Sequence, residues 1–378
     1  MLRPPLLVTC LGTVNNKNQS EPEMKAILFE AFGGPIRVDQ VPAPVAPDHG
    51  VVVQVALTGL CRSDWHGWMG HDPGISLPHV PGHEFAGHVS SVGSAVTRFT
   101  VGDRVTVPFV GGCGQCAPCH TGNQQVCDAQ SQPGFTHWGS FAEYVRVDRA
   151  DLNVVHLPDS VSFEAAAGLG CRFATAFRAL VDQGRISAGQ FVAIFGCGGV
   201  GLSAVAIAAS AGARVIAVDL SDDALALACE LGAEQGINAG VTAAVPAAVR
   251  ALSHGGVAVG IDALGHTNTC VQSVLSLAKR GKHIQVGLMA GEHARAPLPM
   301  DVIVANELEV LGSHGIQAHR YDAMLGLLIS GQVKPDTLVR RVVGLDQGAE
   351  LLASMDSNPL PGVTLIQPSL GRHVDTSG

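Results

Sequence analysis

Four cysteines close together in the sequence constrain this chain more than any other feature. Cys113, Cys116, Cys119 and Cys127 form a C-x2-C-x2-C-x7-C run, with glycines and a proline between them. Zinc takes four thiolates at about 2.3 Å in closed tetrahedral sites, and two-residue gaps place successive sulfurs on one side of a tight turn. An iron–sulfur cluster also uses close cysteines, and a pair of disulfides would need an oxidising compartment. We predict a structural zinc lobe at about residues 111–128.

The composition fits a large acidic globular chain. Its 378 residues are 47% hydrophobic, which is enough to bury the cores of two domains. The net charge is −9 and basic clusters are absent, so we expect no nucleic-acid partner. No uninterrupted apolar stretch has the length of a membrane span, so we expect no membrane partner either.

The N-terminal residues 1–23 read as an extension to the fold. They combine a short apolar patch with a polar, breaker-rich stretch that falls short of a secretory signal. We predict that this extension is disordered and that the first strand begins at Met24. Ten cysteines, most of them placed as metal ligands, indicate a reducing compartment. We therefore expect a cytoplasmic protein.

The secondary-structure pattern of the sequence changes near the middle of the chain. From Met24 to about Val110, short β-branched runs broken by Gly and Pro predict a β-rich half. From Phe191 onward, strand-like and helix-like segments alternate. The strand-like runs are 191–195, 214–219, 257–261, 283–286 and 308–311, and the helix-like runs are 200–211 and 222–231. This alternation predicts an α/β fold with a doubly wound parallel sheet.

A glycine motif follows the first strand of the alternating half. The run 191–195 leads directly into G-x-G-x-x-G and then into an apolar helix. Such glycines permit a tight turn, close approach to a pyrophosphate at the helix N-terminus, and close packing of helix on strand. The next strand ends in a carboxylate, which accepts hydrogen bonds from a ribose and repels a 2′-phosphate. We predict NAD binding rather than NADP binding, with these residues as contacts: Gly196, Gly198, Gly199, Val200, Gly201 and Asp219.

Three further residues are candidates for a second metal site. Cys61, His83 and Cys171 each lie in a glycine-containing segment. Two cysteines and one histidine would make an open zinc site that keeps a fourth position for water or substrate. Spacing alone does not group them, and a lone histidine beside Gly and Glu is as often a loop or core residue.

With these motifs in this order, the chain from Met24 to about Gln367 resembles a zinc-dependent alcohol dehydrogenase of the medium-chain dehydrogenase/reductase superfamily. The segment Gly82-His-Glu-x-x-Gly87, followed by Gly93 and Val96, is similar to that family's zinc signature. The resemblance implies a GroES-like β-rich catalytic domain at 24–171, an NAD-binding Rossmann domain at 172–314, and a return to the catalytic domain at 315–378.

The resemblance also implies a catalytic zinc. Cys61, His83 and Cys171 would bind it, which makes two zinc ions per chain together with the cysteine lobe. Glu84, directly after His83, would be a nearby carboxylate that can transiently approach the metal.

The neighbours of Cys61 match further roles in the family. By resemblance, Ser63 would share a proton with the substrate hydroxyl and His66 would pass it through the cofactor ribose towards solvent. Asp64 would orient the zinc-binding histidine, and Arg62 would help to hold the pyrophosphate. From the residues alone, Ser63 and Asp64 fit helix caps equally well, and Arg62 fits a solvated surface charge.

The activity that the resemblance implies is reversible oxidation of a primary or secondary alcohol to an aldehyde or ketone, with hydride transfer to NAD. The chain lacks the long insertion of the dimeric animal enzymes before the zinc signature, so a homotetramer is expected, with a dimer as the alternative. Many relatives carry a basic residue after a glycine in the last strand region, where this chain has Gly362 and then Val363. Arg340 or Arg341 would then supply the missing cofactor-phosphate contact.

Two rival classes stay open. One is a polyol, threonine or glutathione-adduct dehydrogenase, or an activated double-bond reductase, on the same scaffold. Polyol enzymes often replace the third zinc ligand with a carboxylate and lack the lobe, whereas this chain has Cys171 and all four lobe cysteines. Double-bond reductases usually lose the catalytic ligands. The other class, a non-catalytic NAD-binding protein, would have no reason to keep the full set of ligands with Ser63 and His66.

Overall fold

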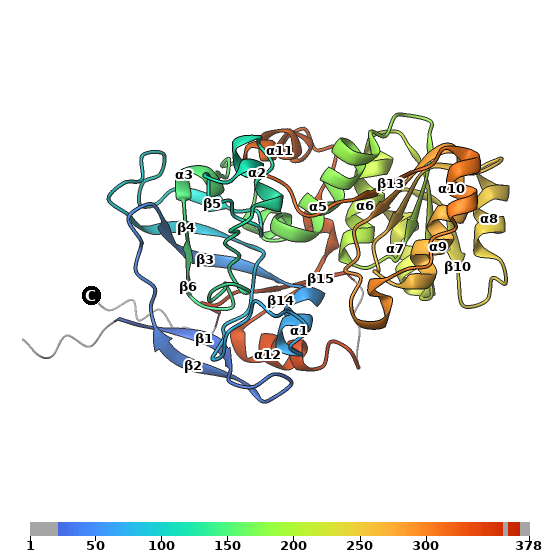
Figure 1. The fold of residues 1–378 in the computed structure, drawn as a ribbon. Coiled ribbons are helices and arrows are strands. Elements are labelled where there is room, and N and C mark those ends of the chain that lie inside the picture. Colours follow the sequence, from blue (N-terminus) through green and yellow to red (C-terminus); the bar gives the residue numbers. More distant parts are fainter. Residues whose placement is uncertain (1–21, 358–361, 371–378) are drawn as a thin grey trace, which may run out of the picture.

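The computed structural model describes residues 22–357 and 362–370 (Figure 1). The predicted disordered extension, residues 1–23, lies outside the described residues except for its last two. The strand predicted to begin at Met24 begins one residue earlier, at Glu23. Two sheet-containing halves lie side by side, and both the first and the last described strands belong to the same half.

A seven-stranded sheet forms the core of the first half. The strand order is β14-β15-β3-β4-β5-β7, and β6 also pairs with β3. Adjacent strands are antiparallel, except that β14 and β15 are parallel. The strands are β3 (Val51–Leu60), β4 (Phe85–Val92), β5 (Arg104–Thr106), β6 (Tyr144–Val147), β7 (Val155–His156), β14 (Val339–Val343) and β15 (Val363–Ile366). A separate hairpin-like pair, β1 (Glu23–Phe29) and β2 (Ile36–Pro42), covers this half. The alternating valines of β3 pack with Phe85 and Val105 in one apolar cluster.

The second half is a six-stranded parallel sheet of order β10-β9-β8-β11-β12-β13. Its strands are β8 (Phe191–Phe195), β9 (Arg214–Asp219), β10 (Ala233–Asn238), β11 (Val257–Asp262), β12 (Leu277–Gln285) and β13 (Glu309–Gly312). Its helices are α6 (Gly199–Ser210), α7 (Asp222–Glu230), α8 (Val245–Leu252), α9 (Thr267–Leu275) and α10 (Met300–Asn306).

Both faces of this parallel sheet are buried. In β8, Val192 and Ile194 pack in one apolar cluster while Ala193 and Phe195 pack in another on the opposite face. This two-sided burial explains why the strand reads as a continuous apolar run rather than an alternating one. The predicted doubly wound α/β sheet is therefore confirmed.

Short helices connect the two halves. They include α3 (Ala150–Asn153), α4 (Phe163–Ala166) and α5 (Ala174–Arg178), with π-helical stretches η2 (Leu169–Phe173) and η3 (Ala179–Gly184) between and after them. This stretch is not one regular α-helix, because the wider turn of η2 separates α4 from α5 and η3 follows α5 directly. Such π-helical turns occur frequently at functional sites, and η2 contains Cys171.

The remaining helices lie in the first half or beside it. They are α1 (Arg62–Trp68), α2 (Ala117–His120), α11 (Tyr321–Ile329) and α12 (Leu345–Ala353). Within the described part of the chain, no helix combines the length and apolarity that a membrane crossing requires.

Candidate active site and metal centres

The first site begins where β3 ends and α1 starts. Cys61 is the N-cap residue of α1, and Asp64 occupies the third helical position. The Asp64 carboxylate accepts a hydrogen bond from the Cys61 backbone N–H at 3.0 Å, which is the side-chain half of a capping box. Its other oxygen accepts from His83 Nδ1 at 2.8 Å and from the Gly82 N–H at 3.0 Å. Asp64 is fully buried and so acts both as a helix cap and as an orienting group for His83.

The three residues proposed as catalytic ligands come together here. The Cys61 and Cys171 sulfurs and a His83 ring nitrogen lie within 4.8 Å of one another. His83 Nε2 is buried without a hydrogen-bond partner in the described residues, while Nδ1 faces the Asp64 carboxylate. A proton on Nδ1 therefore leaves the Nε2 lone pair free to point at the two sulfurs.

The electrostatics of this cluster favour a thiolate at Cys61, whereas the hydrogen bond with Cys61, together with burial, raises the pKa of the Cys171 thiol. The hydrogen bond from Cys171 lowers the pKa of the Cys61 thiol well below its usual value, against the opposing effect of burial, and His83 and Arg172 add to the lowering. A buried donor set of two sulfurs and one unpartnered imidazole nitrogen fits zinc with one open position. Phe109 and Phe135 flank the His83 ring, with centroid distances of 6.1 and 5.1 Å.

A buried ion pair lies behind the cluster. The Glu84 Oε1 atom accepts the Arg172 backbone N–H at 2.6 Å, and Oε2 pairs with the Arg172 guanidinium. The guanidinium also donates to the Leu60 carbonyl at 3.2 Å. Burial raises the pKa of Glu84, and the Arg172 charge opposes that rise. Both oxygens of Glu84 are thus engaged by Arg172, a residue that the sequence reasoning missed.

Arg172 also touches the dinucleotide turn. A methyl group placed on Gly199, the first residue of α6, would collide with the Arg172 Cδ atom. One side chain thus contacts both the carboxylate behind His83 and the helix start that faces a cofactor phosphate in this fold. The sequence signal was an arginine directly after a cysteine ligand in an otherwise apolar segment.

The dinucleotide turn has the geometry that its glycines predict. Gly196 has a φ of +92°, and a side chain on Gly201 would collide with the Gly196 carbonyl oxygen. Asp219, at the end of β9, accepts the Cys197 N–H at 2.6 Å and the Ser221 N–H at 2.9 Å. Its carboxylate therefore lies against the turn, next to α6, as the ribose-binding prediction requires.

The proton-relay candidates lie along α1. The Ser63 Oγ atom is 3.9 Å from the Cys61 sulfur, which places it at the cluster. His66 lies one helical turn further on, where residues three apart share a face. Its Nδ1 atom is 2.9 Å from Nδ1 of His71, a contact that the sequence did not predict.

The cations proposed for the cofactor phosphates have protein partners. Arg62 forms an ion pair with Asp356 at 3.0 Å and lies over the Trp65 ring at 4.7 Å. Arg340 lies beside Gly362 and is 3.8 Å from a Glu230 carboxylate oxygen. Their phosphate-binding roles stay predictions.

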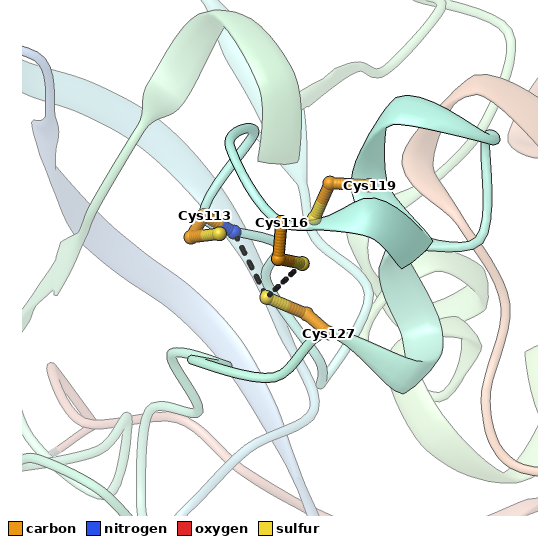
Figure 2. Close-up of side chains that lie close together, drawn as sticks. All are labelled: Cys113, Cys116, Cys119 and Cys127. Carbon is orange, nitrogen blue, oxygen red and sulfur yellow. Dashed lines mark hydrogen bonds between the residues drawn. The ribbon is translucent and has the colours of Figure 1, made fainter.

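The second cluster is the cysteine lobe, shown in Figure 2. The sulfurs of Cys113, Cys116, Cys119 and Cys127 lie within 4.8 Å of one another, and Cys116 and Cys127 are 3.6 Å apart. The Cys113 N–H donates to the Cys127 sulfur at 3.2 Å. The nine cysteines in the described residues are all free thiols.

Backbone hydrogen bonds and burial shift the pKa values of these thiols. The N–H groups of Gln115 and Cys116 lower the pKa of Cys113 to about 6, whereas burial raises the pKa of Cys127 to about 12. Four clustered sulfurs with amide donors fit a closed, structural zinc site. The lobe is also tied to the segment after β13, because Gln317 donates to the Gly122 carbonyl at 3.0 Å and His314 contacts the Gln125 carbonyl at 2.9 Å.

Comparisons with known proteins agree with this geometry. Residues 47–159 match the alcohol dehydrogenase GroES-like domain, and residues 199–330 match the zinc-binding dehydrogenase family. The chain is 35% identical to an alcohol dehydrogenase of Geobacillus stearothermophilus, over 84% of this chain and 91% of that one. It is 33% identical to a sorbitol dehydrogenase of Halalkalibacterium halodurans, over 84% and 91% of the two chains.

A solved structure shows the same arrangement. The alcohol dehydrogenase TADH from Thermus sp. ATN1 superposes with a TM-score of 0.83 at 30% identity, covering 91% of this chain and 99% of that chain. The chain belongs to the zinc-dependent alcohol dehydrogenase family of the medium-chain dehydrogenase/reductase superfamily.

Proposed function

We propose that this protein is an NAD-dependent alcohol dehydrogenase that reversibly oxidises primary or secondary alcohols to aldehydes or ketones. The observation that carries the proposal is the Cys61, His83 and Cys171 cluster, in which the unpartnered His83 Nε2 lies beside two sulfurs and Asp64 fixes the ring from behind. Cys171, a thiol where polyol enzymes often have a carboxylate as the third ligand, and a complete lobe favour alcohol dehydrogenase over the polyol branch.

Each residue around the cluster has a distinct role in the proposed reaction. When bound, zinc would polarise the substrate oxygen as a Lewis acid and NAD would accept a hydride. Asp64 holds the His83 ring so that Nε2 faces the metal position. Ser63, beside Cys61, would take the proton of the substrate hydroxyl while giving its own hydroxyl proton to the cofactor ribose, and His66 would pass a proton from that ribose towards solvent.

The two clusters support two zinc ions per chain. The first three ligands would hold the catalytic ion, and the lobe cysteines would hold the structural ion. Glu84 is a poor additional ligand in this arrangement, because both of its oxygens are engaged by Arg172. An approach of Glu84 to the metal would first have to break that ion pair.

NAD is favoured by Asp219. Its carboxylate lies against the dinucleotide turn, where a 2′-phosphate would meet a negative charge. The pyrophosphate would lie at the start of α6, with Arg62 released from Asp356 as one further contact.

The substrate proposal rests on the surroundings of His83. Phe109 and Phe135 present aromatic rings beside His83, which favours apolar or aromatic alcohols over polyols. The alternative is a polyol substrate, which is what the name of the sorbitol dehydrogenase relative indicates for that protein. An activity assay distinguishes polyols from apolar alcohols as substrates.

The organisation proposed from the sequence has structural support. We keep the division into 24–171, 172–314 and 315–378, because β14 and β15 join β3 in the first half. A homotetramer, with a dimer as the alternative, is supported by β13 as an edge strand and by the exposed apolar side chains of Met300, Val304 and Val310 near it. A cytoplasmic location is supported by the free thiols of both clusters.

Turnover with a defined set of alcohols tests the proposal. Protein with its zinc content measured is given primary, secondary, benzylic and polyol alcohols with NAD or NADP, and NADH or NADPH absorbance is followed. Reduction of NAD with simple or benzylic alcohols supports the proposal. Preferred turnover of sorbitol-like polyols would move the protein to the polyol branch, and turnover with NADP alone would contradict the role of Asp219.

A further inference from the structure

Two histidines face each other at the end of α1. The helix ends at Trp68, Gly70 turns the chain with a φ of +77°, and the His71 backbone N–H donates to the His66 carbonyl at 3.0 Å. This turn brings the two imidazole rings together, with their Nδ1 atoms 2.9 Å apart. The Trp65 ring meets both imidazoles edge-on, at 5.0 and 5.8 Å, and limits where they can move.

The contact has a definite chemical form. Two Nδ1 atoms at 2.9 Å can share one proton, with one ring as donor and the other as acceptor. His66 is half-buried and makes no other side-chain hydrogen bond among the described residues, while His71 is exposed. The pair therefore runs from the interior to the surface, and the Nε2 atom of His71 is free to exchange with water.

Charges around the pair keep its inner member neutral. Burial lowers the pKa of His66, repulsion from His71, when that ring is protonated, and from Arg62 adds to the lowering, and the Cys61 and Asp356 charges only partly oppose it. The Asp72 carboxylate accepts a hydrogen bond from the Gly74 N–H at 2.8 Å and, among the described residues, makes no hydrogen bond or ion pair with either ring. A neutral His66 near pH 7 can accept a proton rather than already carry one.

We propose that His71 is a second imidazole in the proton exit of this enzyme, taking from His66 the proton that leaves the active site and releasing it to bulk water. The inference rests on the proposed alcohol oxidation. A proton binds His66 at Nε2, the Nδ1–H bond of His66 breaks as an Nδ1–H bond forms on His71, and the Nε2–H of His71 is lost to water. No electrons are transferred, and exchange with water restores the starting tautomers between turnovers.

A kinetic experiment tests the relay. In His71→Phe, whose aromatic ring still packs on Trp65, we expect kcat for alcohol oxidation to fall roughly tenfold between pH 6 and 8. This loss is smaller than the roughly 10²–10⁴-fold effect of a direct general base. The KM for NAD should stay unchanged, and added imidazole should restore kcat in proportion to its concentration. The matched control is His49→Phe, at an exposed histidine on the loop before β3, which should behave as wild type.

A second measurement separates this inference from the proposed function. Nitrogen-15 spectra of histidine-labelled protein, without substrate, report which ring nitrogens carry protons and share hydrogen bonds. We expect one Nδ1–H shared between His66 and His71 in wild type and its loss in His71→Phe. Spectra without that shared proton, or an unchanged kcat and pH profile in His71→Phe, would overturn the relay. If wild type oxidised no alcohol at all, the proposed function would fall and the relay, which depends on it, would fall too, whatever the spectra showed of the ring contact.

Discussion

The two thiolate clusters differ in how the chain builds them. The lobe cluster comes from one short segment, lies partly exposed, and has backbone amides as its main hydrogen-bond donors. The Cys61, His83 and Cys171 cluster draws on three distant segments, is largely buried, and is supported by charged side chains. The first therefore depends on local spacing, and the second depends on the fold of the whole molecule.

This difference indicates different uses. A closed cluster with four sulfurs and no free position can only hold its loop in place. An open cluster with buried charges around it costs stability, because each desolvated ion needs a partner, and such arrangements concentrate at functional sites. The following variants separate a cluster that holds structure from one that performs chemistry.

Loss of a ligand from the buried cluster should have the largest effect. In Cys61→Ala we expect turnover to fall by about 10³-fold or more, since about 4 kcal/mol of transition-state stabilisation corresponds to that factor. The zinc content should fall by one ion per chain while the far-ultraviolet spectrum stays unchanged. If Cys61→Ala lost one zinc ion but kept full activity, the Cys61, His83 and Cys171 cluster would not be the catalytic site.

Breaking the buried ion pair should mainly reduce stability. Arg172→Met leaves the Glu84 carboxylate buried without its cation, which costs about 3–5 kcal/mol of unfolding free energy. The double variant Arg172→Met with Glu84→Gln removes the uncompensated charge and should recover much of that loss. Denaturant unfolding measures both, and equal losses in the single and double variants would show that the pair does not act as a unit.

Loss of a lobe ligand should show the opposite pattern to Cys61→Ala. With three thiols left, Cys116→Ser should lose the lobe zinc and the stability it adds, about 2.7 kcal/mol if free zinc stands at 100 times its Kd. Turnover at low temperature should persist. Cys229→Ser, at an exposed free thiol outside both clusters, is the control. If Cys116→Ser instead abolished turnover in folded protein, the contrast between the clusters would fail.

The orienting carboxylate should give the smallest of these effects. Asp64→Asn keeps the size of the side chain but removes the charge that fixes the His83 tautomer, and we expect about 10–100-fold lower metal affinity or activity. Zinc titration and NADH assays measure the two. The exposed Asp301→Asn serves as the control, and an unchanged zinc affinity in Asp64→Asn would mean that Asp64 acts only as the cap of α1.

The local features of the fold were predictable from the sequence. The lobe cysteines and the dinucleotide glycines carry their geometry in their spacing, and the apolar run 191–195 is strand β8 as predicted. The grouping of Cys61 with Cys171 needed the resemblance, because only tertiary packing brings β3 and η2 together. The local sequence does not determine whether a helical turn is an α-helix or a wider π-helix, so the π-helical stretches η2 and η3 were missed.

Side-chain partners were the least predictable part. The resemblance singled out Arg62 and His66, but their contacts with Asp356 and His71 depend on how the segment after α12 and the turn after α1 pack. Arg172 was missed, although it engages both oxygens of Glu84. Long polar side chains choose partners from the whole surface around them, and spacing in one segment cannot specify that choice.

The position of β15 beside β3 has a consequence for how the protein is made. β3 leads directly into Cys61. On the edge of β3 opposite β4, β6 pairs with residues 51–54, and only the last residues, 58–60, pair with β15, which begins at Val363. During synthesis this last part of the edge stays unpaired until the whole parallel sheet, which lies between β3 and β15 in the sequence, has left the ribosome. The newborn first half would thus keep the strand end next to Cys61 open to neighbouring chains until β15 arrives.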